Sequence, residues 1–186
     1  KFDLSMFYLG LTLFFGIHLV PLNTSIKNSL KLKLGETIYI CLFSLISLVG
    51  LSFIVFGYES NSTLLYPISG LLIDYSEYVM FLSLTLLVAS IFPTYIKQFI
   101  KHPMSMGIAI WAVLHLLTNS DKYSIILFSS FLIYAFISVV VAELRAKKTK
   151  LTDTRFGFDI LAVILGIFLT FLAFNYHEYL SGVRLV

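Results

Sequence analysis

Charged residues, cysteines and metal-binding motifs are all scarce in this 186-residue chain. Charged side chains make up 12% of the sequence, well below the roughly one quarter found in soluble domains. Cys41 is the single cysteine, which excludes an internal disulfide framework, and no CxxC or zinc-finger spacing occurs. Phosphate-binding loops, dinucleotide-binding glycine patterns, G-x-S-x-G and HExxH are also missing. The sequence therefore gives no support for a nucleotide-dependent enzyme, a serine hydrolase or a zinc protease.

Apolar residues are abundant instead. They form 59% of the chain, with 18 Phe and 11 Tyr, and the mean hydropathy is +0.94. Such a chain would expose too much apolar surface in water, so its main partner is expected to be the lipid bilayer. The length suits one domain.

Six apolar segments are each close to the roughly 20 residues that a membrane-spanning helix needs. Backbone groups left unpaired in lipid are costly, so each segment is expected to be helical. We predict an all-α, polytopic integral membrane protein, a six-helix bundle. Pro93 should kink or stop the third segment. The expected helices cover residues 4–22, 36–57, 76–96, 102–119, 122–144 and 156–180.

The basic residues gather in alternate connections. Ten of the 13 follow the first, third and fifth segments. By the positive-inside rule these connections face the cytoplasm or an organellar matrix, and both termini face the other side. A bacterial or organellar inner membrane is the expected location, and the run RAKKTK is interpreted as a loop of this kind, with no nucleic acid as partner. The ten are Lys27, Lys31, Lys33, Lys97, Lys101, Arg145, Lys147, Lys148, Lys150 and Arg155.

Histidines in or beside the apolar segments are candidate functional residues, because ionisable groups are costly in lipid. His115 lies deepest, and helix spacing places it on one stripe with Gly107 and Trp111. Glycine would admit a flat group and tryptophan would border it. The alternative is a helix-packing stripe in which His115 bonds a neighbouring helix. His102 lies at the start of its segment, where it is either a cap at the membrane interface or a residue of the site. His177 is expected at the outer interface.

Two histidines on different helices could hold a haem iron from both sides. No CxxCH occurs, so the haem would be non-covalent haem b. Residues 102 and 115 are separated by about 20 Å along a straight helix. The residues alone therefore leave two ligand pairs open, His18 with His115 and His18 with His102.

Four stretches resemble the NnrU family, and the resemblance extends over nearly the whole chain. They are FFGIHLVP, LGETIYICLFSLISLVGL, IKHPMSMGIAIWAVLHLLTNSD and HEYLSGVRL. The most specific part is HPM-x-x-G-x-x-x-W-x-x-x-H, which runs from His102 to His115. The family is polytopic and is named for a gene linked to bacterial denitrification.

The family is also similar to zeta-carotene isomerase, a membrane haem b protein. This resemblance implies His18 and His115 as the metal ligands, with Gly107, Trp111 and His102 along the pocket. It further implies an isomerase or redox activity on a lipid-soluble substrate. Ala112 stands where the isomerase has a cysteine, so a change of ligand to thiolate is excluded here.

Two other functions remain open. The HP-x-x-x-G region resembles integral-membrane methyltransferases that bind S-adenosylmethionine, and Glu178 with Tyr179 would supply the acidic and aromatic residues at the cofactor mouth. A non-catalytic subunit of a larger membrane complex is the second, because short connections leave little soluble surface for a site. Whether the protein is an enzyme is not decided by its sequence.

Overall fold

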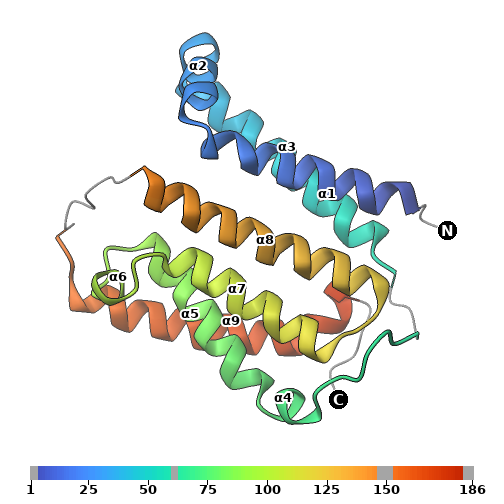
Figure 1. Cartoon of the computed structure of the whole chain (residues 1–186). Helices are drawn as coiled ribbons and strands as arrows, with labels where there is room; N and C mark the ends of the chain where they lie inside the picture. The colour runs from blue at the N-terminus through green and yellow to red at the C-terminus, as the bar shows by residue number, and fades with distance from the viewer. Residues whose placement is uncertain (1–3, 60–62, 146–152, 182–186) are drawn as a thin grey trace. The chain divides into compact units, whose positions relative to one another are not determined.

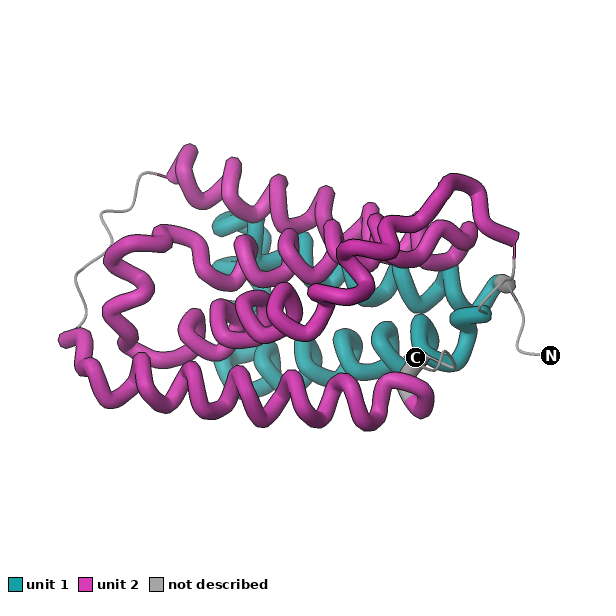
Figure 2. The backbone as a smooth tube through the Cα atoms, turned by 90° about the horizontal axis from the view of Figure 1, so that it is seen from below, with its two compact units in different colours: residues 1–59 teal, residues 60–186 magenta. Residues whose placement is uncertain are grey.

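The structure, a computed structural model, describes residues 4–59, 63–145 and 153–181. All regular structure in these ranges is helical, which confirms the all-α prediction. The chain forms two compact units, residues 1–59 and residues 60–186 (Figure 2).

Unit 1 contains two long helices joined by a turn of 3-10 helix and a short helix. α1 and α3 run side by side (Figure 1). Pro21 lies in the 3-10 turn that follows α1, because proline cannot continue the hydrogen bonding of an α-helix. The elements are α1 (Leu4–Leu19), η1 (Val20–Leu22), α2 (Thr24–Leu34) and α3 (Glu36–Gly57).

α2 is a helix where the sequence indicated only a basic connection. The Asn23 side chain accepts a hydrogen bond of 3.1 Å from the Ile26 N–H, a standard N-terminal cap. Gly35 ends the helix with a φ of 83°, a conformation that glycine adopts without steric penalty. The segment is too polar and too short to register as a membrane span, which is why the apolar pattern missed it.

Unit 2 contains the other six helices of the described residues. α7 packs against both α5 and α8, and α5 also packs against α9, so the long helices follow the spatial order α8, α7, α5, α9 (Figure 1). α5 stops two residues before Pro93, as the sequence predicts. The elements are α4 (Gly70–Asp74), α5 (Ser76–Ile91), α6 (Ile96–Phe99), α7 (Pro103–Thr118), α8 (Lys122–Leu144) and α9 (Phe156–Ser181).

Small residues let α5 and α9 pack closely. Val88 and Ala89 of α5 form a buried cluster with Ala162 of α9. One turn further along α9, a Cβ added to Gly166 would collide with the Thr85 side chain. This close approach fixes α9 against the helix that also supports α7.

Among the described residues, four helices are long and apolar enough to cross a membrane. They are Ser5–Leu22, Glu36–Gly57, Lys122–Leu144 and Phe156–Tyr179. α5 and α7 have 16 residues each, about 24 Å of helix, which is shorter than the roughly 30 Å hydrocarbon core. All six predicted segments are helical, but helix length supports four spans rather than six.

The connections of unit 2 that carry basic residues meet at one end of the unit. The turn after α5, the end of α8 and the start of α9 lie together there (Figure 1). The Arg155 N–H donates to the Pro93 carbonyl at 3.1 Å, which ties the start of α9 to that turn. The basic Lys147, Lys148 and Lys150 and both chain ends lie outside the described residues.

Asp159 holds α9 to α6, and we expect Asp159→Ala to destabilise unit 2. Its two carboxylate oxygens accept hydrogen bonds from the backbone N–H groups of Tyr95 and Ile96, at 3.0 and 3.1 Å. Loss of a cap of this kind lowers the free energy of unfolding by about 1 kcal/mol, measurable by unfolding in mixed micelles. Asp159→Asn keeps one acceptor and should lose less. Asp153→Ala is the control, since that side chain is 91% exposed; equal effects at the two positions would contradict the prediction.

Candidate functional site

α7 carries most of the residues that the sequence singled out, and both of its ends are fixed. Pro103 occupies its first turn, where a missing N–H is tolerated. Its other end is held by the segment 63–69 through two backbone hydrogen bonds of 2.9 Å. The Leu65 N–H donates to the Ser120 carbonyl, and the Ser69 N–H donates to the Leu117 carbonyl. Tyr66 donates to the Leu116 carbonyl beside them. His115 therefore lies on a helix end that is held in place.

The His115 ring is anchored by its own helix. Its Nδ1 lies 2.8 Å from the Trp111 carbonyl oxygen. A carbonyl can only accept, so Nδ1 is the donor and a neutral imidazole carries its lone pair on Nε2. Histidines that bind metals usually donate their other ring N–H to a carbonyl or carboxylate in this way.

Aromatic side chains surround His115. Phe128 of α8 stacks on the imidazole, with ring centres 4.4 Å apart and planes at 28°. Trp111 contacts Phe128 and Phe131 edge to face, at 4.9 and 5.0 Å. The ring of His177, from α9, lies 6.4 Å from that of His115. Trp111 and His115 thus face an aromatic cluster on α8, and His177 joins it from another helix.

His18 in unit 1 repeats the local geometry of His115. Its Nδ1 lies 2.6 Å from the Phe14 carbonyl oxygen, one helical turn earlier. Its ring stacks on Phe14 at 4.2 Å, and Phe43 of α3 contacts it at 5.1 Å. The two histidines that the isomerase resemblance marks therefore share one tautomer, with the lone pair on Nε2.

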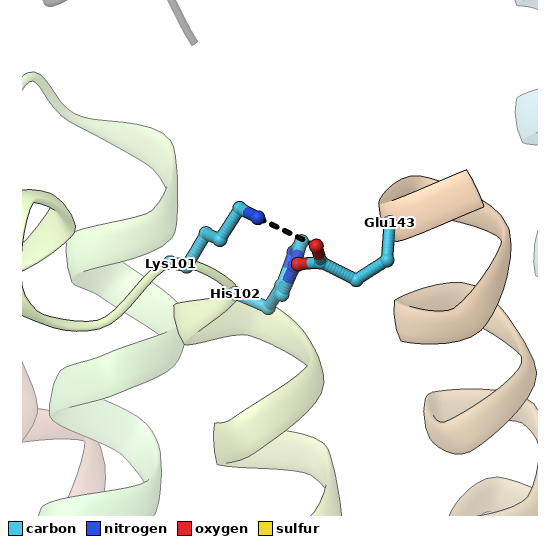
Figure 3. A network of polar contacts seen from close by, with 3 residues as sticks. All are labelled: Lys101, His102 and Glu143. Carbon is cyan, nitrogen blue, oxygen red and sulfur yellow. Dashed lines mark hydrogen bonds and ion pairs between the residues drawn. The ribbon is translucent and has the colours of Figure 1, made fainter. Parts of the chain in front are cut away.

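His102 has a different environment. Its Nε2 lies 2.6 Å from Glu143 Oε1, and Lys101 Nζ lies 2.6 Å from Glu143 Oε2 (Figure 3). Its side chain makes no cap hydrogen bond to α7. Glu143 could not be linked to His102 from the sequence, because it lies 41 residues further along the chain. In His102, Nε2 is thus engaged by a carboxylate.

Gly107 faces α5 and not the aromatic cluster. Ser83 Oγ donates to the Gly107 carbonyl at 2.8 Å, and a Cβ added to Gly107 would lie 2.8 Å from the Ser83 carbonyl oxygen. α5 itself fills the space that glycine leaves. Gly107 is therefore a point of close packing between α7 and α5.

The two parts of the methyltransferase resemblance lie far apart in unit 2. The HP motif begins α7, whereas Glu178 and Tyr179 follow His177, which contacts the other end of that helix. The 13 residues from His102 to His115 rise about 20 Å. Within unit 2 these residues do not form one site. The described residues also contain no group of three or more His, Cys, Asp or Glu placed to hold a metal ion.

Comparison with known families identifies the chain. The model of the NnrU protein family matches residues 6–185. This chain belongs to the NnrU family. The match confirms the resemblance seen in the sequence, and it includes His18, His115 and the HP motif. No curated protein and no solved structure matches the chain. For this NnrU protein, function is therefore inferred from its own residues.

Proposed function

We propose that this NnrU protein is an integral membrane protein that binds haem b, with His115 as an iron ligand. The observation that carries the proposal is the hydrogen bond from His115 Nδ1 to the Trp111 carbonyl. It holds the imidazole at a fixed angle and leaves the lone pair on Nε2, from which His115 would bind the haem iron.

The surroundings of His115 are compatible with this role. A metal–imidazole bond lies in the plane of the ring, so Phe128 can stack on the face without blocking Nε2. The aromatic neighbours Trp111 and Phe131 would keep water away. The cluster thus supports a neutral, oriented ligand in a dry environment, the conditions under which a protein adjusts haem potential.

His18 is the proposed second ligand. The resemblance to the isomerase implies it, and the Nδ1 bond to the Phe14 carbonyl supports it because that bond repeats the tautomer of His115. His177 is the competing assignment, since its ring is 6.4 Å from that of His115. Replacing each histidine separately distinguishes the two.

The activity we propose is a redox or isomerase reaction on a lipid-soluble substrate. Bound haem would supply one-electron chemistry at iron, and the protein would supply the imidazoles and the dry site. Ala112 is buried beside Trp111 and leaves no thiol there, so the ligand set would consist of histidines.

We also propose an inner-membrane location with the Lys97 and Lys101 end of unit 2 toward the cytoplasm or matrix. Lys97, Lys101, Arg145 and Arg155 gather at that end, and Lys122 begins α8 at the other. This distribution supports the orientation that the positive-inside rule predicts.

A visible spectrum of the protein tests the haem proposal. The full chain is purified in detergent from haem-replete cells, and spectra are recorded oxidised and then reduced with dithionite. We expect a Soret band, with sharpened bands after reduction that are typical of two nitrogen ligands, and about one haem per chain. Purified, folded protein without a Soret band would overturn the proposal.

A further inference from the structure

An apolar groove of about 630 Å³ runs between α7 and α8. Met106 and Ala109 line it from α7, and Leu132 and Phe136 line it from α8. Its volume lies within the roughly 300–1,000 Å³ of small-molecule sites. The lining residues His102, the N-cap of α7, and Ala109 are about 10 Å apart along the helix axis, so the groove is long enough for part of an acyl chain.

One end of the groove is charged. Lys101 and His102 line it there, and both bond the Glu143 carboxylate at 2.6 Å (Figure 3). Each oxygen of Glu143 therefore has a partner of its own. The Lys101 ammonium has three N–H donors, and its side chain is 63% exposed. Lys101 can accordingly bond a second acceptor without leaving Glu143.

We propose that this groove binds one anionic phospholipid of the surrounding membrane. An acyl chain would lie between α7 and α8, and the phosphate would lie beside Lys101. Lys97 and Arg145 add positive charge to the same end of unit 2. Basic pockets between membrane helices on the cytoplasmic side bind anionic headgroups in this way. The groove shares His102 with the pocket that the isomerase resemblance implies, but it shares no residue with the aromatic cluster around His115, so the proposal does not depend on haem binding.

Trp111 is a built-in reporter for the groove. It is the only tryptophan in the chain. It lies two residues beyond Ala109 on α7 and contacts Phe131, the neighbour of Leu132 on α8. α7 rises about 12 Å from Pro103 to Trp111, more than a third of the hydrocarbon core. Bromine atoms midway along an acyl chain would therefore quench Trp111 fluorescence when the headgroup is at Lys101.

The experiment compares brominated lipids in vesicles of zwitterionic phosphatidylcholine that contain the full chain prepared without haem, because haem at His115 would itself quench Trp111, whose ring centre lies 5.1 Å from that of His115. Brominated phosphatidylglycerol should reach half-maximal quenching at a mole fraction about fivefold lower than brominated phosphatidylcholine, which is the effect of one basic residue near an anionic lipid. Lys101→Gln should remove this preference. Lys97→Gln also removes one positive charge, but Lys97 does not line the groove. This variant should keep most of the preference for the anionic lipid. Equal quenching by the two lipids in the wild-type protein would overturn the proposal.

A matched pair of substitutions on α8 tests the groove itself. Val139 lines it, whereas the adjacent Val140 does not. Val139→Phe should fill the groove and weaken quenching by the anionic lipid severalfold, and Val140→Phe should leave it unchanged. An anionic preference that survives both Lys101→Gln and Val139→Phe would place the lipid elsewhere. Quenching by a brominated neutral alkane at the same low mole fraction would show that the headgroup is not recognised, and would also overturn the proposal.

Discussion

Replacing His115 by Ala should remove the Soret band from the purified protein. The substitution deletes the proposed iron ligand and leaves the aromatic cluster without the imidazole that Phe128 covers. Haem content should fall from about one per chain to a level below detection, because non-covalent haem depends on its axial ligands. Spectra and haem content of protein matched for monodispersity in detergent provide the measurement.

Added imidazole separates the loss of a ligand from the loss of the fold. If His115→Ala only lacks the ligand, millimolar imidazole and haem should restore part of the Soret band. A misfolded variant would not respond. A His115→Ala protein that keeps the wild-type spectrum would show that His115 does not bind the iron, even if haem is present.

Separate variants of the other two histidines identify the second ligand. His18→Ala should change the spectrum to that of iron with one imidazole, or lose the haem. His177→Ala should keep the wild-type spectrum, although its ring is 6.4 Å from that of His115. The reverse pattern would contradict His18 and assign His177. The Nδ1 bonds of His18 and His115 to carbonyls one turn earlier favour the first outcome.

The long helices could be predicted from the sequence because apolar runs between polar residues define them. The segments expected at 36–57 and 122–144 match α3 and α8 at both ends. The short helices could not, since α4 and α6 have five and four residues and α2 is polar. Hydropathy also could not separate spans from shorter buried helices, so six expected spans correspond to four helices of sufficient length.

The candidate site was predictable only where its contacts are local. The Nδ1 atoms of His18 and His115 bond carbonyls one helical turn earlier. The motifs around these two histidines identified them as candidate site residues. The pairing of His102 with Glu143 and the approach of His177 to His115 join helices far apart in sequence. No periodicity encodes such contacts. Gly107 shows the same limit, because its spacing fits both a cofactor wall and a helix contact, and its close packing against α5 is visible only in the structure.

Two alanine substitutions on α1 should have opposite effects on stability. Gly10 lies where α1 meets α3, and a Cβ there would be 2.6 Å from the Ile54 nitrogen and 2.8 Å from the Gly50 carbonyl oxygen. Both are backbone atoms, so Gly10→Ala must push the helices apart. Glycine-mediated contact of this kind is a main source of helix association in lipid, and overpacking costs about 1–3 kcal/mol or more.

Gly16 is the matched control on the same helix, since a Cβ there would meet nothing within 4 Å. Gly16→Ala should therefore raise the free energy of unfolding by about 0.5–1 kcal/mol, the advantage of alanine over glycine within a helix. Unfolding of both variants in mixed micelles measures the difference. The sign of the change in stability matters more than its size. Helix propensity favours alanine equally at both positions, so only contact with the α3 backbone distinguishes Gly10 from Gly16. If Gly10→Ala is as stable as Gly16→Ala, then α1 and α3 do not pack through Gly10.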